Sequence, residues 1–181
     1  MKTIVQEDAP VLREIAVPVP ENLFGSQKLM SILQDMAEAL NREPDGVALA
    51  APQIAVPYRI FIVRVDRTLP APPHDENEPD ALPAPGPQVD VYINPEIVKT
   101  SRRRAEMEEG CLSVRGVYGT TRRHERVTVR ARHPNGTRFE RGGGGLLAQI
   151  FEHETDHLNG ILFIDHADHL IETSPNHDAT V

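Results

Sequence analysis

The sequence contains one cysteine, no tryptophan and few other aromatic residues, which together make up 4% of its 181 residues. A single cysteine cannot form a disulfide within the chain, so we expect Cys111 to keep a free thiol in a reducing compartment. No stretch is apolar enough to span a membrane, and the acidic first residues fit neither a signal peptide nor a transit peptide. These absences predict a cytoplasmic protein with no membrane partner.

Positive charge is also scarce. The 19 Lys and Arg residues are outnumbered by 27 Asp and Glu residues, and the formal net charge of −8 argues against nonspecific nucleic-acid binding by phosphate neutralisation. Two local runs, 102–104 and 122–123, consist of arginine. We interpret them as a solvated face, with phosphate contact as the alternative. No direct, sequence-specific nucleic-acid binding is expected.

Hydrophobic periodicity predicts two helices and several short strands in a chain long enough for one domain. The first helix follows a cap at Ser26 and ends before Pro44, and the second covers residues 146–158 and ends at Asn159-Gly160. Strand signals cover residues 58–65, 89–93, 97–98, 127–131 and 138–140. This order predicts an α+β fold in which antiparallel β-sheets pack around a central helix.

Four segments lie outside this pattern. Prolines predict an extended arm over residues 1–25, and residues 68–88 form a proline-rich acidic loop. The glycines at 142–145 are interpreted as a flexible entry to the second helix rather than a phosphate loop, because no Gly-Lys-Ser/Thr follows. We therefore predict one domain over residues 1–165 and a short polar tail over residues 166–181.

The predicted central helix carries the pattern His-Glu-x-x-His at residues 153–157. Residues four apart lie on one helix face, so His153 and His157 can reach one divalent metal ion while Glu154 projects beside it as a base. The apolar turns before this pattern indicate that the helix is buried, and buried histidines need a partner such as a metal. We therefore expect a metal-binding helix that supports hydrolysis.

A hydrolytic metal usually takes three protein ligands, and the third is not obvious. The position used by one group of proteases is occupied by Phe163, and Glu172 is too close to the histidines for another. Downstream ligands remain in principle open, at Asp165, His166, Asp168 and His169. Upstream, Cys111 lies in a polar, turn-like segment next to a glycine; it is either a ligand or a small buried apolar residue.

Three segments together resemble the peptide deformylase family: residues 46–53 (GVALAAPQ), 109–113 (EGCLS) and 153–158 (HETDHL). Their order and spacing match that family, and the resemblance covers about residues 8–165. It implies that Cys111, His153 and His157 bind the metal and that Glu154 is the acid/base. It also implies that Gln53 and the backbone N–H of Leu112 face the formyl oxygen.

The same resemblance implies a substrate site. Gly46 and small residues would let an extended peptide pair with the backbone, and apolar side chains would surround the methionine of the substrate. The implied substrate-binding residues are Gly46, Val47, Ala48, Met107, Glu109, Gly110, Leu146 and Ile150.

The implied activity is removal of the formyl group from N-formylmethionyl nascent peptides, with release of formate. The implied cofactor is one divalent metal ion, Fe²⁺ in the cell, with Zn²⁺, Ni²⁺ or Co²⁺ in a purified sample. The expected ribosome proximity is transient. Docking by the long basic C-terminal helix that some relatives use is not expected, because the sequence shows no such helix after Ile164.

The chain departs from the family pattern at Ala48, Arg115, Gln149 and Glu152, none of which is an implied ligand. These departures leave two alternatives open. One is a metallohydrolase that acts on other acylated peptides, and the other is a metal-binding protein without turnover. The presence of both Glu154 and Gln53 argues against the second alternative.

Overall fold

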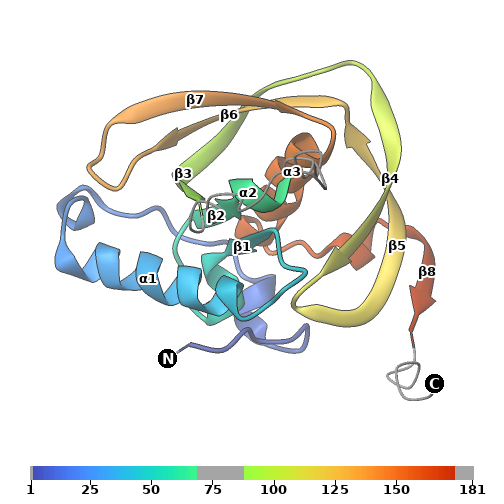
Figure 1. Ribbon diagram of the computed structural model, residues 1–181, viewed down its shortest axis with the longest axis horizontal. Coiled ribbons are helices and arrows are strands. Elements are labelled where there is room, and N and C mark those ends of the chain that lie inside the picture. The colour runs from blue at the N-terminus through green and yellow to red at the C-terminus, as the bar shows by residue number, and fades with distance from the viewer. Residues whose placement is uncertain (1, 69–87, 174–181) are drawn as a thin grey trace, which may run out of the picture.

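The computed structural model in Figure 1 describes residues 2–68 and 88–173 of the chain. Two antiparallel sheets surround one helix, α3; the larger sheet has the strand order β1-β2-β3-β6-β7 and the smaller has β4-β5-β8. The α+β fold with antiparallel sheets is therefore confirmed. The elements are α1 (Gln27–Asn41), β1 (Ala48–Ala50), β2 (Ile60–Arg64), α2 (Val65–Thr68), β3 (Val89–Thr100), β4 (Arg104–Cys111), β5 (Val114–His124), β6 (Arg126–Arg132), β7 (Arg138–Gly144), α3 (Leu146–Leu158) and β8 (Asp168–Glu172).

Helix α1 begins and ends where the sequence predicts. The Ser26 side chain accepts a hydrogen bond from the backbone N–H of Leu29 at 3.2 Å, which satisfies one free donor of the first turn. The residues Leu29, Leu33, Met36 and Leu40 recur at helical spacing and are buried against the larger sheet. Burial of this apolar stripe fixes the helix on the outer side of β1 and β2.

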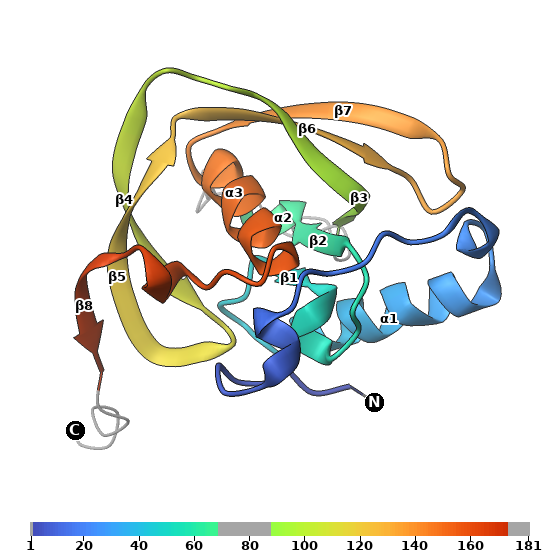
Figure 2. The same cartoon turned by 180° about the vertical axis from the view of Figure 1, so that it is seen from behind.

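Helix α3 has the predicted bounds and lies between the two sheets, as Figures 1 and 2 both show. Its apolar side is buried in a core shared with the larger sheet, where Phe151 contacts Tyr92 with ring centroids 5.3 Å apart. Tyr92 also stacks on Phe61 at 4.6 Å. Edge-to-face and offset aromatic contacts of this kind add about 0.5–1.5 kcal/mol each to the burial term. The opposite side of α3 faces the smaller sheet.

Two strands are longer than predicted. The strand signals at 89–93 and 97–98 belong to one strand, β3, with an irregularity between Ile93 and Glu96. Asn94 causes the interruption in the pattern, because it adopts a positive φ of 50° and its side chain bonds the backbone of Val19. The prediction of a flexible glycine entry at 142–145 is wrong for Gly142, Gly143 and Gly144, which pair with β6 as the end of β7.

The strand signals in the sequence do not include the hairpin β4–β5. Its arginine runs were interpreted as a solvated face, which is correct for Arg102 and Arg122 but wrong for Arg123, whose side chain is buried. The alternation along β5 places Arg123 toward α3 and Arg122 on the exposed face of the strand. A polar residue on the buried face of a strand does not give the apolar alternation from which strands are predicted.

The remaining segments are partly described. The arm over residues 2–25 is largely extended, as predicted, and includes short 3-10 turns at Pro10–Arg13 and Glu21–Leu23. The predicted acidic loop lies outside the described residues except for Thr68 and Gln88. Residues 168–172, assigned to the polar tail, form β8 beside β5; the domain boundary at 165 stays a prediction. No helix in the described part of the chain is long and apolar enough to cross a membrane.

Candidate metal centre and active site

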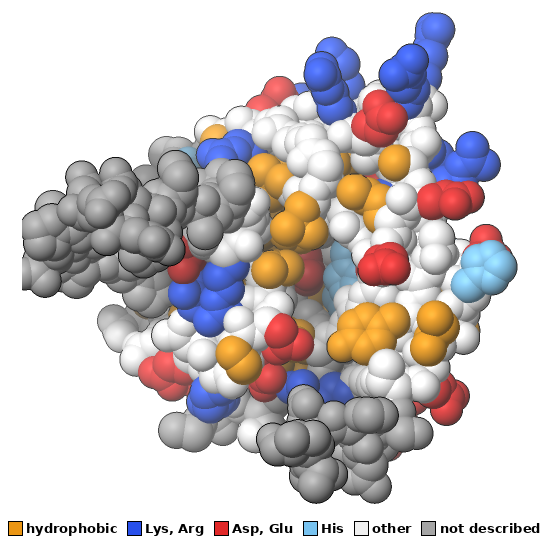
Figure 3. All heavy atoms as spheres, turned by 45° about the vertical axis from the view of Figure 1, so that its right-hand side comes forward, with side chains coloured by type: hydrophobic (Ala, Val, Ile, Leu, Met, Phe, Trp, Pro, Cys, Tyr) orange, Lys and Arg blue, Asp and Glu red, His pale blue; other side chains and the backbone are white. Residues whose placement is uncertain are grey.

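A cavity of about 420 Å³ opens between β1, β4 and α3. β1 and β4 are edge strands of their two sheets. Figure 3 shows this hollow with acidic and histidine side chains at its floor. The cavity brings together most of the predicted site residues, namely Gly46, Val47, Ala48, Gln53, Glu109, Gly110, Cys111, Leu112, Leu146, Ile150, His153 and Glu154. Met107 is not among its lining residues.

Cys111 and His153 line the inner end of the cavity, where they meet the buried side chain of His157, which is not a lining residue. One potential ligand atom from each residue lies within 4.8 Å of those of the other two, and the Cys111 Sγ is 3.2 Å from His157 Nε2. The helical spacing places the two imidazole rings 4.9 Å apart. In the described residues, no other group of three His, Cys, Asp or Glu side chains is so close, so Asp165, His166, Asp168 and His169 do not complete the site.

The donor set fits a divalent transition metal. A thiolate and two imidazoles suit iron, zinc, nickel or cobalt better than magnesium or calcium. His157 is buried and its Nδ1 has no hydrogen-bond partner in the described structure, while its Nε2 faces the thiol. Burial lowers the pKa of His157 well below its usual value and keeps the ring neutral. A neutral imidazole is the form that binds a metal.

Glu109 orients the first histidine. Its Oε1 lies 2.5 Å from His153 Nδ1, so Nε2 is the ring nitrogen left for the metal. Burial alone would raise the pKa of Glu109. The hydrogen bonds from His153 and Arg123 have the larger effect and hold the pKa far below its usual range. For His153, burial would lower the pKa, but contacts with Cys111 and Glu109 raise it.

Arg123 extends this interaction from β5 to α3. It donates to Glu109 through Nη2 at 2.6 Å and Nε at 3.0 Å, and through Nη1 to Asp156 at 2.7 Å. Thr121 donates a further bond to Glu109 at 2.5 Å. Sequence reasoning placed Glu109 in the substrate site and missed Arg123 and Asp156. A strand prediction over β5 would have indicated, from the alternation of its residues, that Arg123 faces α3 and its histidines.

Replacing Glu109 by glutamine should weaken both the metal site and the fold. The amide leaves Arg123 without its main buried counter-ion, and breaking a buried ion pair typically costs about 3–5 kcal/mol. Loss of a partner that orients a metal ligand typically costs about 10–100-fold in metal affinity. Urea denaturation and metal titration measure the two effects, with Glu106→Gln, an exposed acid on the same strand, as control. Equal stability of the two variants would contradict the prediction.

Glu154 lies beside the metal site with only 3% of its surface exposed. Its Oε2 has no hydrogen-bond partner among the described residues. Burial raises the pKa of Glu154 to about 7 in the metal-free protein. A carboxylate with a pKa near neutrality can both accept and return a proton at neutral pH.

The raised pKa predicts a specific loss of stability in the metal-free protein. The folded carboxyl keeps its proton up to about pH 7, whereas the unfolded one ionises near 4.5, so stability falls as pH rises between these values. The free energy of unfolding should decrease by up to about 3 kcal/mol from this group. Denaturation of chelator-treated protein should show Glu154→Gln equal to wild type near pH 4 and more stable above pH 7. A difference that does not change with pH would contradict this.

Gln53 lies on the 3-10 turn Ala51–Ile54 that follows β1. Its Oε1 accepts a bond from the Ala50 N–H at 2.8 Å, and its Nε2 donates to Ser113 Oγ at 3.1 Å and lies 3.6 Å from Cys111 Sγ. These contacts fix the amide with its N–H groups toward the thiol. Leu112 follows Cys111 in the turn between β4 and β5 and also lines the cavity.

One face of α3 forms a wall of the cavity. Leu146, Gln149, Ile150 and His153 recur at helical spacing along this wall. Gln149 donates from Nε2 to the Glu108 carbonyl at 2.8 Å and so connects α3 to β4. The neighbouring wall needs glycine at Gly110, because a Cβ there would meet the Tyr118 ring at 2.8 Å.

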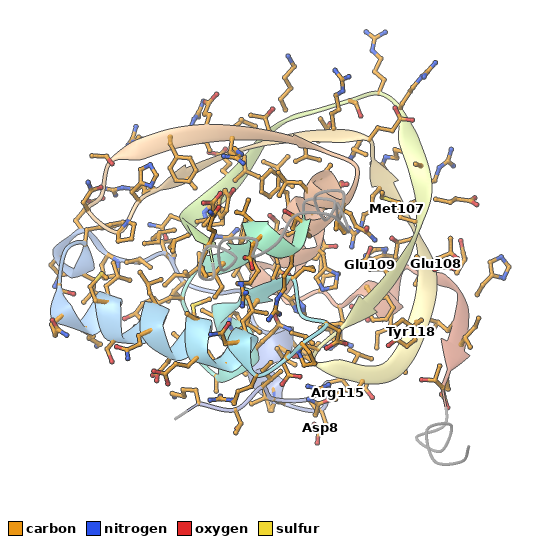
Figure 4. All side chains as sticks on the ribbon, viewed as in Figure 1. Asp8, Met107, Glu108, Glu109, Arg115 and Tyr118 are labelled. Atoms are coloured by element: carbon orange, nitrogen blue, oxygen red, sulfur yellow. The ribbon has the colours of Figure 1, made fainter. Side chains whose placement is uncertain are left out.

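Two of the residues that depart from the family pattern, Glu152 and Arg115, form polar contacts with other parts of the fold. Glu152 accepts bonds from the backbone N–H of His124 at 2.8 Å and lies 2.7 Å from its Nδ1, which ties α3 to β5. Arg115, which lines the cavity, forms an ion pair with Glu43 at 2.6 Å. Figure 4 shows Arg115 at the lower end of the β4–β5 hairpin, with Met107 higher on β4.

Comparison with known proteins agrees with this geometry. Residues 1–172 match the model of a family described as Polypeptide deformylase. The chain is 38% identical to the peptide deformylase of Dehalococcoides mccartyi over 179 residues, which covers 97% of this chain and 93% of that protein. A peptide deformylase structure from Legionella pneumophila has a TM-score of 0.76 at 37% identity and covers 93% and 87% of the two chains. A Met-Ala-Ser-bound class I type b peptide deformylase from Acinetobacter baumannii has a TM-score of 0.76 at 34% identity and covers 92% and 99%.

Proposed function

The chain belongs to the peptide deformylase family, and from this premise we propose how its residues carry out the reaction. The enzyme is a metal-dependent hydrolase that removes the formyl group from the N-terminal formylmethionine of newly made polypeptides and releases formate. The observation that carries the proposal is the meeting of one thiol, two imidazoles and a buried carboxylate at the inner end of one cavity.

We assign the metal to Cys111, His153 and His157, which makes α3 the central metal-binding helix. When bound, a divalent cation supplies a Lewis acid that polarises the formyl carbonyl and lowers the pKa of water to about 7. Fe²⁺ is the proposed metal in the cell, and the same donors accept Zn²⁺, Ni²⁺ or Co²⁺ in a purified sample. The site fits these ions because His157 is held neutral and His153 is oriented by Glu109.

The peptide would bind as an added strand between the edges of β1 and β4. Gly46, Val47 and Gly110 line this path, and Val47, Leu146 and Ile150 would contact the methionine side chain. The Acinetobacter baumannii relative has a structure with Met-Ala-Ser bound, which supports a peptide as the ligand of this chain. Met107 is a weaker candidate for the methionine pocket, because it lies outside the lining of the cavity.

Glu154 would accept a proton from the attacking water as the new C–O bond forms at the formyl carbon. It would then give this proton to the amine nitrogen as the C–N bond breaks, so that formate and a free N-terminus leave. The developing negative charge on the formyl oxygen would be met by the Gln53 amide and the Leu112 N–H. Donors fixed before the reaction, as Gln53 is by Ala50 and Ser113, need no reorganisation.

Replacing Gln53 by alanine should lower kcat for a formylmethionyl peptide by about 10²–10³-fold, the usual effect of losing one such donor. The metal content should not change, because Gln53 is not a ligand. Rates and metal content are measured on the same preparation. A loss of activity that parallels a loss of metal would show that Gln53 only supports the metal site.

Release of formate from formyl-Met-Ala-Ser by anaerobically purified, iron-loaded protein tests the proposed roles. Acetyl-Met-Ala-Ser is the control substrate, and turnover of the acetylated peptide alone would indicate a different deacylase. Elemental analysis of protein purified without added metal identifies the ion. We further propose a cytoplasmic enzyme that meets nascent chains in transient proximity to the ribosome.

A further inference from the structure

A group of cations lies at the corner where the larger sheet passes into the smaller one. We call the exposed residues Lys99, Arg102, Arg103, Arg104, Arg122 and Arg126 the basic corner. They come from the end of β3, the turn before β4, the start of β4, the end of β5 and the start of β6. Figure 3 shows Lys and Arg side chains projecting at this upper end of the molecule, above the open cleft.

Hydrogen bonds hold the backbone of the basic corner in place. The Ser101 N–H donates to the Arg126 carbonyl at 2.9 Å, and the Glu125 N–H donates to the Arg103 carbonyl at 3.1 Å. The Ser101 side chain adds bonds to both turns, at 2.8 Å to the Arg103 carbonyl and 3.1 Å from the Arg126 N–H. The cations are thus presented from fixed backbone positions, which reduces the ordering cost of binding a partner.

The fold makes little use of these charges. Arginines elsewhere form ion pairs, as Arg130 does with Glu140 and Arg132 with Glu21. In contrast, none of the six corner cations forms an ion pair with a described residue, and Arg104 donates a hydrogen bond to Nε2 of His124 at 3.1 Å. Four exposed acids, Glu96, Glu106, Glu108 and Glu125, lie on the same strands and turn. Among the described residues the corner therefore keeps a net positive charge that is available to an external anion.

A phosphate backbone fits this surface best. The chain as a whole carries −8 charges, so a polyanion is repelled from most of the surface and is attracted at this corner. Arginine also pairs with phosphate through two parallel hydrogen bonds. Given the proposed function, the substrate emerges from a particle whose surface is rich in RNA, and a partner at the corner leaves the cleft open.

We propose that the basic corner docks the enzyme on the phosphate backbone of RNA without reading base sequence. Such binding is weak and depends steeply on salt, because each neutralised phosphate releases counter-ions. Docking is consistent with an enzyme that samples nascent chains and departs. It requires no change at the metal site.

Fluorescence anisotropy with a fluorescein-labelled RNA hairpin tests the proposal. The variant Arg102→Ser/Arg103→Ser/Arg122→Ser should bind at least about 10-fold more weakly at low salt, and the slope of log K against log salt should fall by about 2–3. The control Arg130→Ser/Arg138→Ser/Arg141→Ser removes the same charge from exposed positions on β6 and β7 and should change affinity less than about threefold.

Equal weakening by both triple variants would overturn the proposal, because it would reflect net charge alone. Absence of RNA binding by wild type at about 50 mM salt would also overturn it, as would binding of phosphatidylserine vesicles in place of RNA. Formate release from formyl-Met-Ala-Ser should be the same in wild type and both variants, which separates docking from the proposed catalytic roles. Thermal unfolding of each variant verifies that the corner is still folded.

Discussion

Replacing Glu154 by alanine should lower kcat/KM for a formylmethionyl peptide by about 10²–10⁴-fold, the usual contribution of a positioned acid/base. The side chain is almost fully buried beside His153 and His157, and one carboxylate oxygen has no partner in the described structure. No other described residue of the cavity lies beside the metal site and has a pKa raised to about 7. The measurement is formate release under anaerobic conditions with saturating metal.

The metal content of Glu154→Ala should equal that of wild type, because this carboxylate does not belong to the Cys/His₂ group. Glu152→Gln is the matched control on the same helix. Glu152 accepts bonds from His124 on β5 and points away from the metal site, so its neutral isostere should keep activity within a few-fold. Comparable losses in the two variants would mean that charge on α3, rather than proton transfer, limits the rate.

The sequence was most informative about local structure. The helix 146–158 follows from its apolar turns and its Asn-Gly end, and its bounds agree with α3. The spacing of His153 and His157 places both rings on one face, so two ligands follow from helix geometry alone. Ser26 likewise predicted the start of α1. These features depend on residues within one or two turns of each other.

The third ligand depends on tertiary structure. Cys111 and His157 are 46 residues apart, and the β4–β5 hairpin brings them together. No period in the sequence predicts that approach; the resemblance to a family implied it. Arg123 was missed for a related reason, because a charged residue on the buried face of β5 resembles part of a solvated run until its partners Glu109 and Asp156 are known.

The glycines near α3 illustrate a third limit. A run of four glycines favours flexibility on its own, yet Gly142, Gly143 and Gly144 complete β7. Packing explains one of them, since a Cβ at Gly143 would meet the Leu147 side chain at 2.7 Å. Glycine here allows the strand to approach the first turn of α3, and that approach positions the helix that carries His153 and His157.

Replacing Cys111 by alanine should remove the metal and, with it, all measurable turnover. The thiol supplies one of three ligand atoms that lie within 4.8 Å of each other, and two imidazoles alone leave an incomplete site. The loss in metal affinity should exceed the about 10–100-fold expected for removing a group that only orients a ligand. Elemental analysis after gel filtration and a competitive metal titration measure it.

Two controls make the Cys111 result specific. His166→Ala removes a downstream imidazole that lies outside the Cys/His₂ group and should retain the metal. Chelator-treated wild type should unfold at about the same temperature as Cys111→Ala, since both lack the ion that stabilises the folded state. Metal retained by Cys111→Ala but lost from His166→Ala would move the third ligand downstream of α3.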